Sequence, residues 1–386
     1  MARHRTRKEM ISAKKQFGSF DNTSPRRWNK IVFGTIFGIS TCAIIMLYFA
    51  FSTPNLDRVV EKEVTGEWHD QKHIWSLQPL NDHQHELVCN RVKIERLNLE
   101  YLRNILIVRT PGSENIIKVK QFLMTTMKSL GWTVEENKFK DSPPKSFSKK
   151  KIEFANVIAT YNPRARRRLV LACHYDSKVT PTGFLGATDS AVPCAMMIEI
   201  AKVLAEYLAR TPKDMDLTLQ YLFLDGEEAF EEWTDKDSLY GSRHLAAKWD
   251  KQKWPPGPKG NKKVLDSIDL FVLLDLLGEK DPSFVSMRNT HSRHYKELIR
   301  IEEKLHVKDG LRYFKPQIKS WSVQDDHVPF LNKNVPVLHI IPSPFPKQWH
   351  RIGDNGENLH NDTIARLTKI FGVFVAEYLH LEPIAF

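Results

Sequence analysis

Apolar residues along this chain gather into short runs that alternate with stretches of helical periodicity. The short runs, each of five to eight residues, lie at 154–160, 169–173, 217–224, 270–275 and 335–341. Apolar positions recur every three or four residues at 87–106, 113–130, 191–210, 238–249, 292–306 and 363–381. Runs of the first kind are typical of buried strands and the second pattern is typical of amphipathic helices. Their alternation predicts an α/β domain with a mostly parallel central sheet covered by helices on both faces.

One apolar stretch is too long for a strand. Residues 31–51 contain no charged side chain over 21 positions, and at about 1.5 Å per residue such a helix crosses a bilayer core of about 30 Å. A signal peptide is the alternative, but its apolar part is usually about 7 to 15 residues long and ends at small residues. This run is longer and ends on Tyr48, Phe49 and Phe51. It therefore predicts a single uncleaved transmembrane helix.

The charge around this helix predicts its orientation. Residues 1–30 carry nine Lys or Arg against Glu9 and Asp21, which is much of the chain's formal net charge of +11. The excess of basic residues places this end in the cytoplasm. We therefore expect a cytoplasmic tail (1–30), an anchor (31–51), a polar stem (52–80) and a lumenal catalytic domain (81–386). Little excess charge is left for the folded part, so we expect no nucleic-acid partner.

Side chains suited to metal binding or proton transfer stand at the ends of four of the predicted strands. They are His174 and Asp176, the sequence Asp225-Gly226-Glu227-Glu228, Asp275 and His350, joined by Asp189 just before a predicted helix. The carboxyl ends of parallel strands share one crevice. Zinc binds His nitrogen and carboxylate oxygen, and catalytic sites keep one position open beside three protein ligands. A lone Asp or His is usually a surface or capping residue, whereas the convergence of four strand ends predicts a metal site.

Several longer motifs make a family resemblance specific. They are VRTPGS at 108–113, CHYDSK at 173–178, GATDSAVPC at 186–194, DGEEAF at 225–230, DSLYGSRH at 237–244, QDDH at 324–327 and PSPFPKQWH at 342–350. With these motifs in this order, residues from about 86 to 381 resemble the animal glutaminyl-peptide cyclotransferases, or glutaminyl cyclases. That resemblance implies the fold of the zinc-dependent aminopeptidases. It also implies an acyltransferase that converts N-terminal glutamine of peptides and secretory proteins to pyroglutamate and releases ammonia.

The resemblance implies roles for individual acids. Asp189, Glu228 and His350 would hold one zinc ion per chain, and Glu227 would carry the proton. Asp275 and Asp325 match further acids that hydrogen-bond near the leaving group. A helix cap for Asp275 and a simple turn for Asp325 are the structural alternatives.

The resemblance also implies a pocket wall. Trp233, Gln324, Phe345 and Trp349 match positions that bind the glutamine side chain, although a core position is the alternative for the aromatic residues. His339 is either part of the same site or a core histidine. Arg351 departs from the threonine that relatives carry, which leaves specificity at that rim open.

A zinc aminopeptidase is the main alternative. Such enzymes bind two metals through a His, a bridging Asp, a Glu, a second Asp and a final His, and this chain offers His174, Asp189, Glu228, Asp275 and His350 in that order. The ligand types therefore do not separate the two activities. The tryptophan pair and the QDDH segment favour the cyclase. A metal-free binding module is the third alternative, but none of the ligand types is missing.

Secretion-related features accompany this interpretation. The resemblance pairs Cys173 with Cys194, with two buried thiols as the alternative. Asn361 begins a glycosylation sequon, Asn-Asp-Thr, that would face the lumen. The membrane-anchored branch of the family implies a Golgi membrane protein of the single-pass type II topology. The sequence does not indicate the oligomeric state.

Overall fold

The computed structural model describes residues 67–212, 214–258, 260–288, 291–305 and 310–385. The predicted tail, anchor and most of the stem therefore lie outside the described residues. Within these ranges, no helix has the length and apolar character needed to cross a membrane.

Six strands form the central sheet. They are β1 (Thr133–Asp141), β2 (Ile152–Thr160), β3 (Arg167–His174), β4 (Leu217–Leu224), β7 (Ile268–Leu274) and β10 (Val337–Ile340), and they pair in the order β1-β2-β4-β3-β7-β10. The strands β4, β3, β7 and β10 run parallel, so their carboxyl ends meet at one edge. β2 pairs antiparallel with both β4 and β1. The sheet is therefore mixed, with a parallel half that corresponds to the sequence prediction and an antiparallel edge that does not.

Ten α-helical segments are found in the described residues. They are α2 (Gln71–Ile74), α3 (Asp82–Arg91), α4 (Ile94–Arg96), α5 (Arg103–Ile105), α6 (Glu114–Ser129), α7 (Val192–Leu208), α8 (Tyr240–Lys251), α9 (Ser292–Leu305), α10 (Val328–Leu331) and α11 (Asn361–Tyr378). The single helix expected at 87–106 is instead divided among α3, α4, a π-helical turn at Leu97–Leu102 and α5. Two small sheets complete the fold, β5 (Lys253–Trp254) with β6 (Lys262–Lys263) and β8 (Phe284–Met287) with β9 (Phe314–Lys319).

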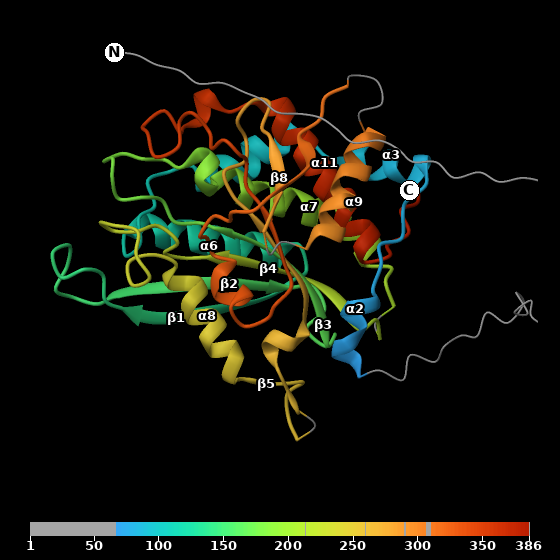
Figure 1. Cartoon of the computed structure of the whole chain (residues 1–386), viewed down its shortest axis with the longest axis horizontal. Coiled ribbons are helices and arrows are strands. Elements are labelled where there is room, and N and C mark those ends of the chain that lie inside the picture. Colours follow the sequence, from blue (N-terminus) through green and yellow to red (C-terminus); the bar gives the residue numbers. More distant parts are fainter. Residues whose placement is uncertain (1–66, 213, 259, 289–290, 306–309, 386) are drawn as a thin grey trace, which may run out of the picture. The chain divides into compact units, whose positions relative to one another are not determined.

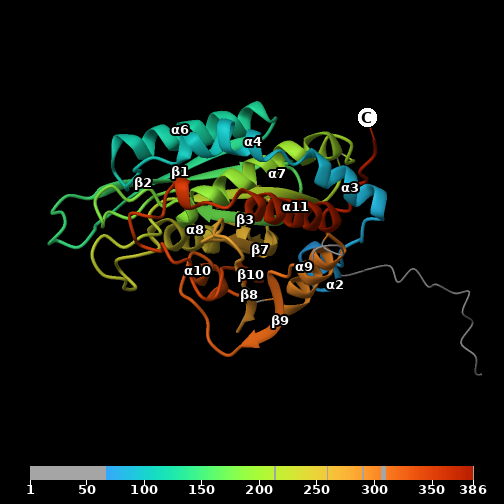
Figure 2. The same cartoon turned by 90° about the horizontal axis from the view of Figure 1, so that it is seen from above.

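Helices cover both faces of the sheet, as the alternation of patterns predicts (Figures 1 and 2). Because side chains alternate along a strand, Leu169 and Leu171 of β3 pack into the cluster that contains α6, α7 and α11. Val170 and Ala172 point to the opposite face, where they pack into the cluster beneath α8 and α10. The register fixes both clusters: Leu171 lies beside Tyr221 of β4 and Val272 of β7.

The packed part of the chain begins before residue 81. Trp75 stacks on His380 with ring centroids 4.3 Å apart, and its Nε1 donates to the carbonyl oxygen of Tyr378 at 2.9 Å. The amide of Leu80 donates to the Glu377 carboxylate at 3.0 Å. The end of the segment predicted as a polar stem is thus held against α11.

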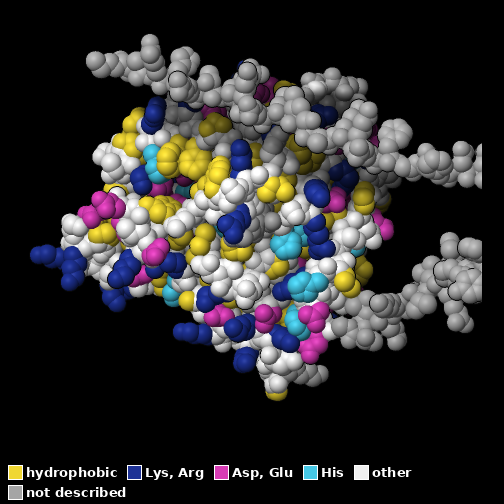
Figure 3. Space-filling model, in the orientation of Figure 1, with side chains coloured by type: hydrophobic (Ala, Val, Ile, Leu, Met, Phe, Trp, Pro, Cys, Tyr) yellow, Lys and Arg dark blue, Asp and Glu magenta, His cyan; other side chains and the backbone are white. Residues whose placement is uncertain are grey.

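The surface carries no single basic face in the view of Figure 3. Lys and Arg side chains are spread over the visible described surface and interspersed with Asp and Glu.

Candidate active site at the carboxyl ends of the strands

A cavity of about 440 Å³ lies at the edge of the sheet where the parallel strands end. Its lining side chains are Lys178, Asp189, Glu227, Trp233, Asp275, Leu276, Val323, Gln324, Asp325, Ile341, Phe345, Trp349 and His350. The structure therefore brings the residues predicted for catalysis and substrate binding to one place, with Glu228 buried directly behind them. Their separate roles stay predictions.

Asp189, Glu228 and His350 form a group suited to one metal ion, since a ligand atom of each lies within 4.8 Å of the others. His350 Nε2 lies 3.5 Å from Asp189 Oδ2 and 3.5 Å from Glu228 Oε1. Both of these carboxylate oxygens are buried and accept no hydrogen bond. Buried oxygens are normally paired, and an imidazole with two carboxylates is a donor set that suits zinc. The residues present therefore fit a zinc ion.

The backbone before α7 sets the position of Asp189. Gly186 has a positive φ of 54°, and a Cβ there would overlap the carbonyl oxygen of Asp189, so the turn requires glycine. Asp354 holds the other side of this turn. Its Oδ1 accepts from the amide and hydroxyl of Thr188 at 2.8 and 2.9 Å, and its Oδ2 accepts from the Asp189 amide at 3.3 Å.

The two adjacent glutamates after β4 are fixed by their backbone. The amides of Glu227 and Glu228 donate to the two carboxylate oxygens of Asp176, at 3.1 and 3.3 Å. Lys178 Nζ lies 3.1 Å from Glu228 Oε2. Glu228 thus gives one oxygen to a lysine and leaves the other free, while the neighbouring Glu227 side chain lines the cavity.

Burial among other acids changes the protonation of this cluster. Burial, together with the charges of Glu228, Asp325 and Asp326, raises the pKa of Glu227 well above that of an ordinary glutamate, against the opposing charge of His174. Burial and the charge of Glu228 raise the pKa of Asp189 to about 7. A raised carboxyl pKa favours a group that can hold and return a proton, which is what a general acid–base residue requires.

His174 lies in a second acidic group beside the first. Its Nε2 is 3.0 Å from Asp189 Oδ1 and 3.5 Å from Asp275 Oδ1, and its Nδ1 is 3.3 Å from Asp176 Oδ1. Burial opposes its charge, but the three carboxylates raise the pKa of His174 well above its usual value. His174, Asp189 and Asp275 also meet the distances of a metal site. Asp275 in addition accepts a hydrogen bond from the Ser190 hydroxyl.

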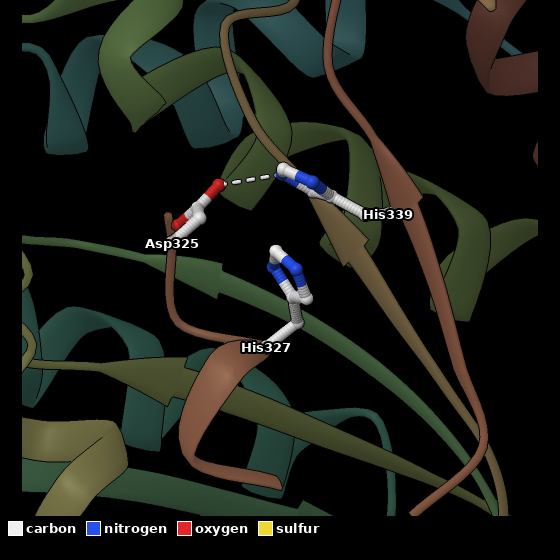
Figure 4. A group of neighbouring side chains, drawn as sticks. All are labelled: Asp325, His327 and His339. Atoms are coloured by element: carbon white, nitrogen blue, oxygen red, sulfur yellow. Dashed lines mark hydrogen bonds and ion pairs between the residues drawn. The ribbon is translucent and has the colours of Figure 1, made fainter. Parts of the chain in front are cut away.

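Asp325 is held by His339, and His327 lies beside that histidine (Figure 4). His339 Nε2 of β10 lies 2.7 Å from Asp325 Oδ2, and the His327 ring lies 4.1 Å from the His339 ring. All three side chains are buried. Asp325 is therefore a fixed carboxylate at the cavity wall, and His339 is a core histidine that also supports the site.

Aromatic side chains form the outer wall. Trp233 and Trp349 are each 39% exposed, so neither is a core residue. Trp233 Nε1 donates to Gln324 Oε1 at 3.2 Å, and Trp349 stacks on His350 with centroids 4.0 Å apart. Phe345 lies edge-on to Trp349 at 4.9 Å and also packs against an apolar cluster. Both alternatives considered for Phe345 therefore describe part of its environment.

The cysteines predicted to pair and the asparagine of the predicted sequon do not line the cavity. Cys173 and Cys194 form a disulfide that links the end of β3 to α7, with Cα atoms 5.9 Å apart. Asn361, the first residue of α11, is exposed, and its Oδ1 accepts from Asn98 Nδ2 at 3.0 Å.

Sequence reasoning missed several residues of the site. Lys178 lies in the CHYDSK motif but was given no role, and Asp354 follows His350 by only four residues. Leu276 is the second residue after β7, and Ile341 is the first residue after β10. A systematic look at the first residues after each parallel strand would have found all of these except Asp354, whose contact with the Asp189 turn depends on the folded loop.

Comparison with known proteins identifies the class and then the family. Residues 156–375 match peptidase family M28, so the chain belongs to that family. A glutaminyl-peptide cyclotransferase-like protein of Mus musculus is 45% identical over 315 residues, which cover 78% of this chain and 80% of the relative. A glutaminyl-peptide cyclotransferase of Boiga dendrophila is 42% identical over 340 residues, covering 83% and 91%. The chain belongs to the glutaminyl-peptide cyclotransferase family.

A solved structure supports the same family. The crystal structure of Macrostomum lignano glutaminyl cyclase superposes with a TM-score of 0.73 at 35% sequence identity, over 80% of this chain and 96% of that one. The fold of this chain therefore matches nearly the full length of that glutaminyl cyclase.

Proposed function

We propose that the folded domain converts N-terminal glutamine of peptides and proteins to pyroglutamate. The observation that carries this proposal is the pair of unpaired buried oxygens on Asp189 and Glu228, which face His350 at the base of an aromatic-walled cavity. In a chain of the glutaminyl-peptide cyclotransferase family, this arrangement suits one zinc ion and one slim side chain.

The reaction needs one bond formed and one bond broken. The α-amine of the substrate attacks the carbon of its own side-chain amide, and the bond from that carbon to the amide nitrogen breaks to release ammonia. Zinc, when bound by Asp189, Glu228 and His350, would polarise the amide oxygen as a Lewis acid.

Glu227 is the proton carrier in this proposal. It lines the cavity beside the metal-binding group, and the raised pKa of its carboxyl suits a residue that must both accept and return a proton. It would take a proton from the attacking amine and give one to the departing nitrogen. Asp275 and Asp325, which line the same cavity, would hydrogen-bond to the leaving group.

The aromatic side chains of the cavity wall are proposed to bind the substrate side chain and to exclude water. Trp233, Phe345 and Trp349 would hold the glutamine side chain and exclude water from the amide carbon, which favours internal attack over hydrolysis. The hydrogen bond between Trp233 and Gln324 fixes one side of this wall.

Peptide hydrolysis by two metals is the second candidate, because His174, Asp189 and Asp275 offer a further metal-type group. Those atoms already contact one another: His174 Nε2 lies 3.0 Å from Asp189 Oδ1. A second metal would have to displace that contact. We therefore propose one zinc per chain.

The deciding assay compares two peptides that differ in their first residue. The purified domain is incubated with a glutamine-initiated and an alanine-initiated peptide of otherwise equal sequence. The proposal expects ammonia and a peptide lighter by one ammonia from the first, and no change in the second. Release of a free amino acid from either peptide would instead support the aminopeptidase.

We also propose that residues 31–51 anchor the chain in the Golgi membrane with the catalytic domain in the lumen, acting on secretory proteins. The uncharged run, the basic residues before it and the disulfide support this topology. Protease treatment of sealed Golgi vesicles should remove a tag placed before Met1 and spare the domain. A mobility shift lost in Asn361→Gln would show that the exposed sequon is glycosylated; digestion of the domain in sealed vesicles would contradict the topology.

A further inference from the structure

A second cavity, of about 310 Å³, lies at the other end of the strands from the active site. Most of its lining residues come from β1, β2, β3 and β4 and from α8, which covers this face of the sheet (Figure 2), and Trp254 of β5 also lines it. Arg168 lines it from the second position of β3, whereas His174, in the active site, is the last residue of the same strand. Six residues of strand place the two roughly 20 Å apart.

Arg168 is a buried cation without an acidic partner. Arg168 is only 5% exposed. Among the described residues, no carboxylate lies within ion-pair distance of its guanidinium. Nη1 donates to the Ser267 hydroxyl, and the guanidinium carbon lies 4.0 Å from the ring centre of Trp254. Nε is buried with no hydrogen-bond partner. Neighbouring Arg167 differs, since its Nε donates to both oxygens of Asp269 at 3.0 and 3.1 Å.

This state of Arg168 is energetically unfavourable by itself. Burial lowers the pKa of Arg168 to about 10, with only a partial opposing effect from the charge of Glu135. Taking a charge out of water without pairing it is costly, whereas a hydrogen-bonded anion would compensate for the burial. An arginine buried beside an open cavity, with its Nε side free of protein acceptors, therefore indicates a ligand.

Further polar groups line the same cavity. Gln220 Nε2 donates to Thr160 Oγ1 at 2.7 Å, while Gln220 Oε1 is buried without a partner. Exchanging the two amide atoms would leave the nitrogen unpaired instead, so the amide has one free polar atom in either orientation. Lys248 of α8 adds a second, exposed cation. Glu136 is already paired with Lys120 and with Lys138.

We propose that this cavity binds an organic oxyanion at the guanidinium of Arg168, which lines it. A planar guanidinium presents N–H groups in a fixed fork that matches two oxygens of a phosphate, sulfate or carboxylate group. Trp254 holds the guanidinium in plane from one face, and Lys248 adds attraction at the rim. The volume exceeds that of a single ion, and Trp249 offers an apolar surface for the remainder of the ligand.

Calorimetric titration at constant ionic strength tests this site. The probes are inorganic phosphate, sulfate, phenyl phosphate and benzoate. Comparing them distinguishes binding of a free inorganic ion from binding of an aromatic ester or an aromatic acid. We expect saturable binding of at least one probe at one site per chain, weakened at least tenfold in Arg168→Gln. Lys251→Gln, which removes an exposed cation from the same helix outside the cavity lining, should bind as the unaltered protein does. Equal affinity in Arg168→Gln, or no saturable binding of any probe, would overturn the proposal.

A second variant keeps the test valid if Arg168→Gln does not fold. Glu135 is exposed, lines the cavity, and its charge acts on Arg168. Glu135→Gln removes a negative charge at the cavity that repels an incoming anion. Tighter binding of the same probe in this variant supports the site. Unchanged or weaker binding contradicts it.

Discussion

Asp189 belongs to two clusters of side chains, and these clusters differ in whether their carboxylate oxygens are paired. On the His174 side, its Oδ1 contacts an imidazole that also contacts Asp176 and Asp275. On the other side, its Oδ2 and Glu228 Oε1 are buried and unpaired near His350. Both groups meet the distances of a metal site, but only the second has oxygens that the chain leaves unsatisfied. Two clusters with the same types of ligand therefore do not bind metal equally well, because neighbouring contacts decide which carboxylate oxygens remain free to bind a metal ion.

The largest expected effect comes from removing a ligand on the open side. Glu228→Gln should lose zinc and bring cyclisation to background, since it replaces a carboxylate that faces His350. The loss should exceed the about 100-fold that removal of an outer-shell partner of a metal ligand can cost. Zinc content by elemental analysis, measured together with the rate of ammonia release, checks this. Full zinc content in the variant would remove Glu228 from the ligand set.

The adjacent residue gives the matched control for that experiment. Glu227→Gln should lower kcat by about 10²- to 10⁴-fold, the usual contribution of a general acid–base residue, while zinc content stays unchanged. The two variants differ by one position and make the same chemical change. If Glu227→Gln also loses zinc, our assignment of the two glutamates is wrong.

The disulfide beside the His174 group should affect stability more than activity. The bond between Cys173 and Cys194 spans 21 residues, and closing such a loop contributes about 3 kcal/mol to the free energy of unfolding in the chain-entropy model. The double variant Cys173→Ser/Cys194→Ser should therefore unfold at lower temperature while its KM stays close to that of the unaltered domain. Non-reducing peptide mapping that found both residues as free thiols would exclude the bond.

A smaller effect, on the pH dependence of stability, is expected from two buried histidines outside the active site. Burial lowers the pKa of His294 to about 3 and that of His85 to about 4, against about 6.5 in an unfolded chain. Between pH 6.5 and these values the unfolded chain binds more protons than the folded one. Their contribution to stability is thus present above about pH 6.5 and is lost as pH falls towards about 3.

Thermal unfolding at pH 7.5 and 4.5 checks the role of His294. His294→Phe should reduce the drop in melting temperature between the two pH values, because its ring already packs near Phe374 and Tyr378 and phenylalanine takes up no proton. His83→Gln, at an exposed position, should leave the drop unchanged. An equal drop in all three proteins would show that other groups govern the loss of stability in acid.

The parallel half of the fold was predictable and the rest was less so. β3, β4, β7 and β10 are continuous apolar runs because both of their faces are buried. β1 was not predicted, since Thr133–Asp141 is mostly polar and lies at the edge of the sheet, where only Phe139 and a few neighbours pack. The predicted helix at 87–106 follows a real apolar periodicity, but its segments are interrupted where Val92 and Lys93 leave helical conformation.

The same contrast holds for functional residues. Asp275 and the two glutamates were predictable because each follows a strand, and the end of a parallel strand has a known place in the fold. Asp354 and Arg168 were not, because their importance depends on loop packing and on the lack of a nearby acid. No spacing in the sequence marks Arg168 as different from its paired neighbour Arg167.

Zinc stoichiometry tests the central claim most directly. Elemental analysis of the purified domain and of His174→Ala should give one zinc per chain in both, because the His174 group is proposed to hold Asp189 and Asp275 rather than metal. Two zinc ions per chain in the unaltered domain, with the second lost in His174→Ala, would contradict the account and favour the aminopeptidase.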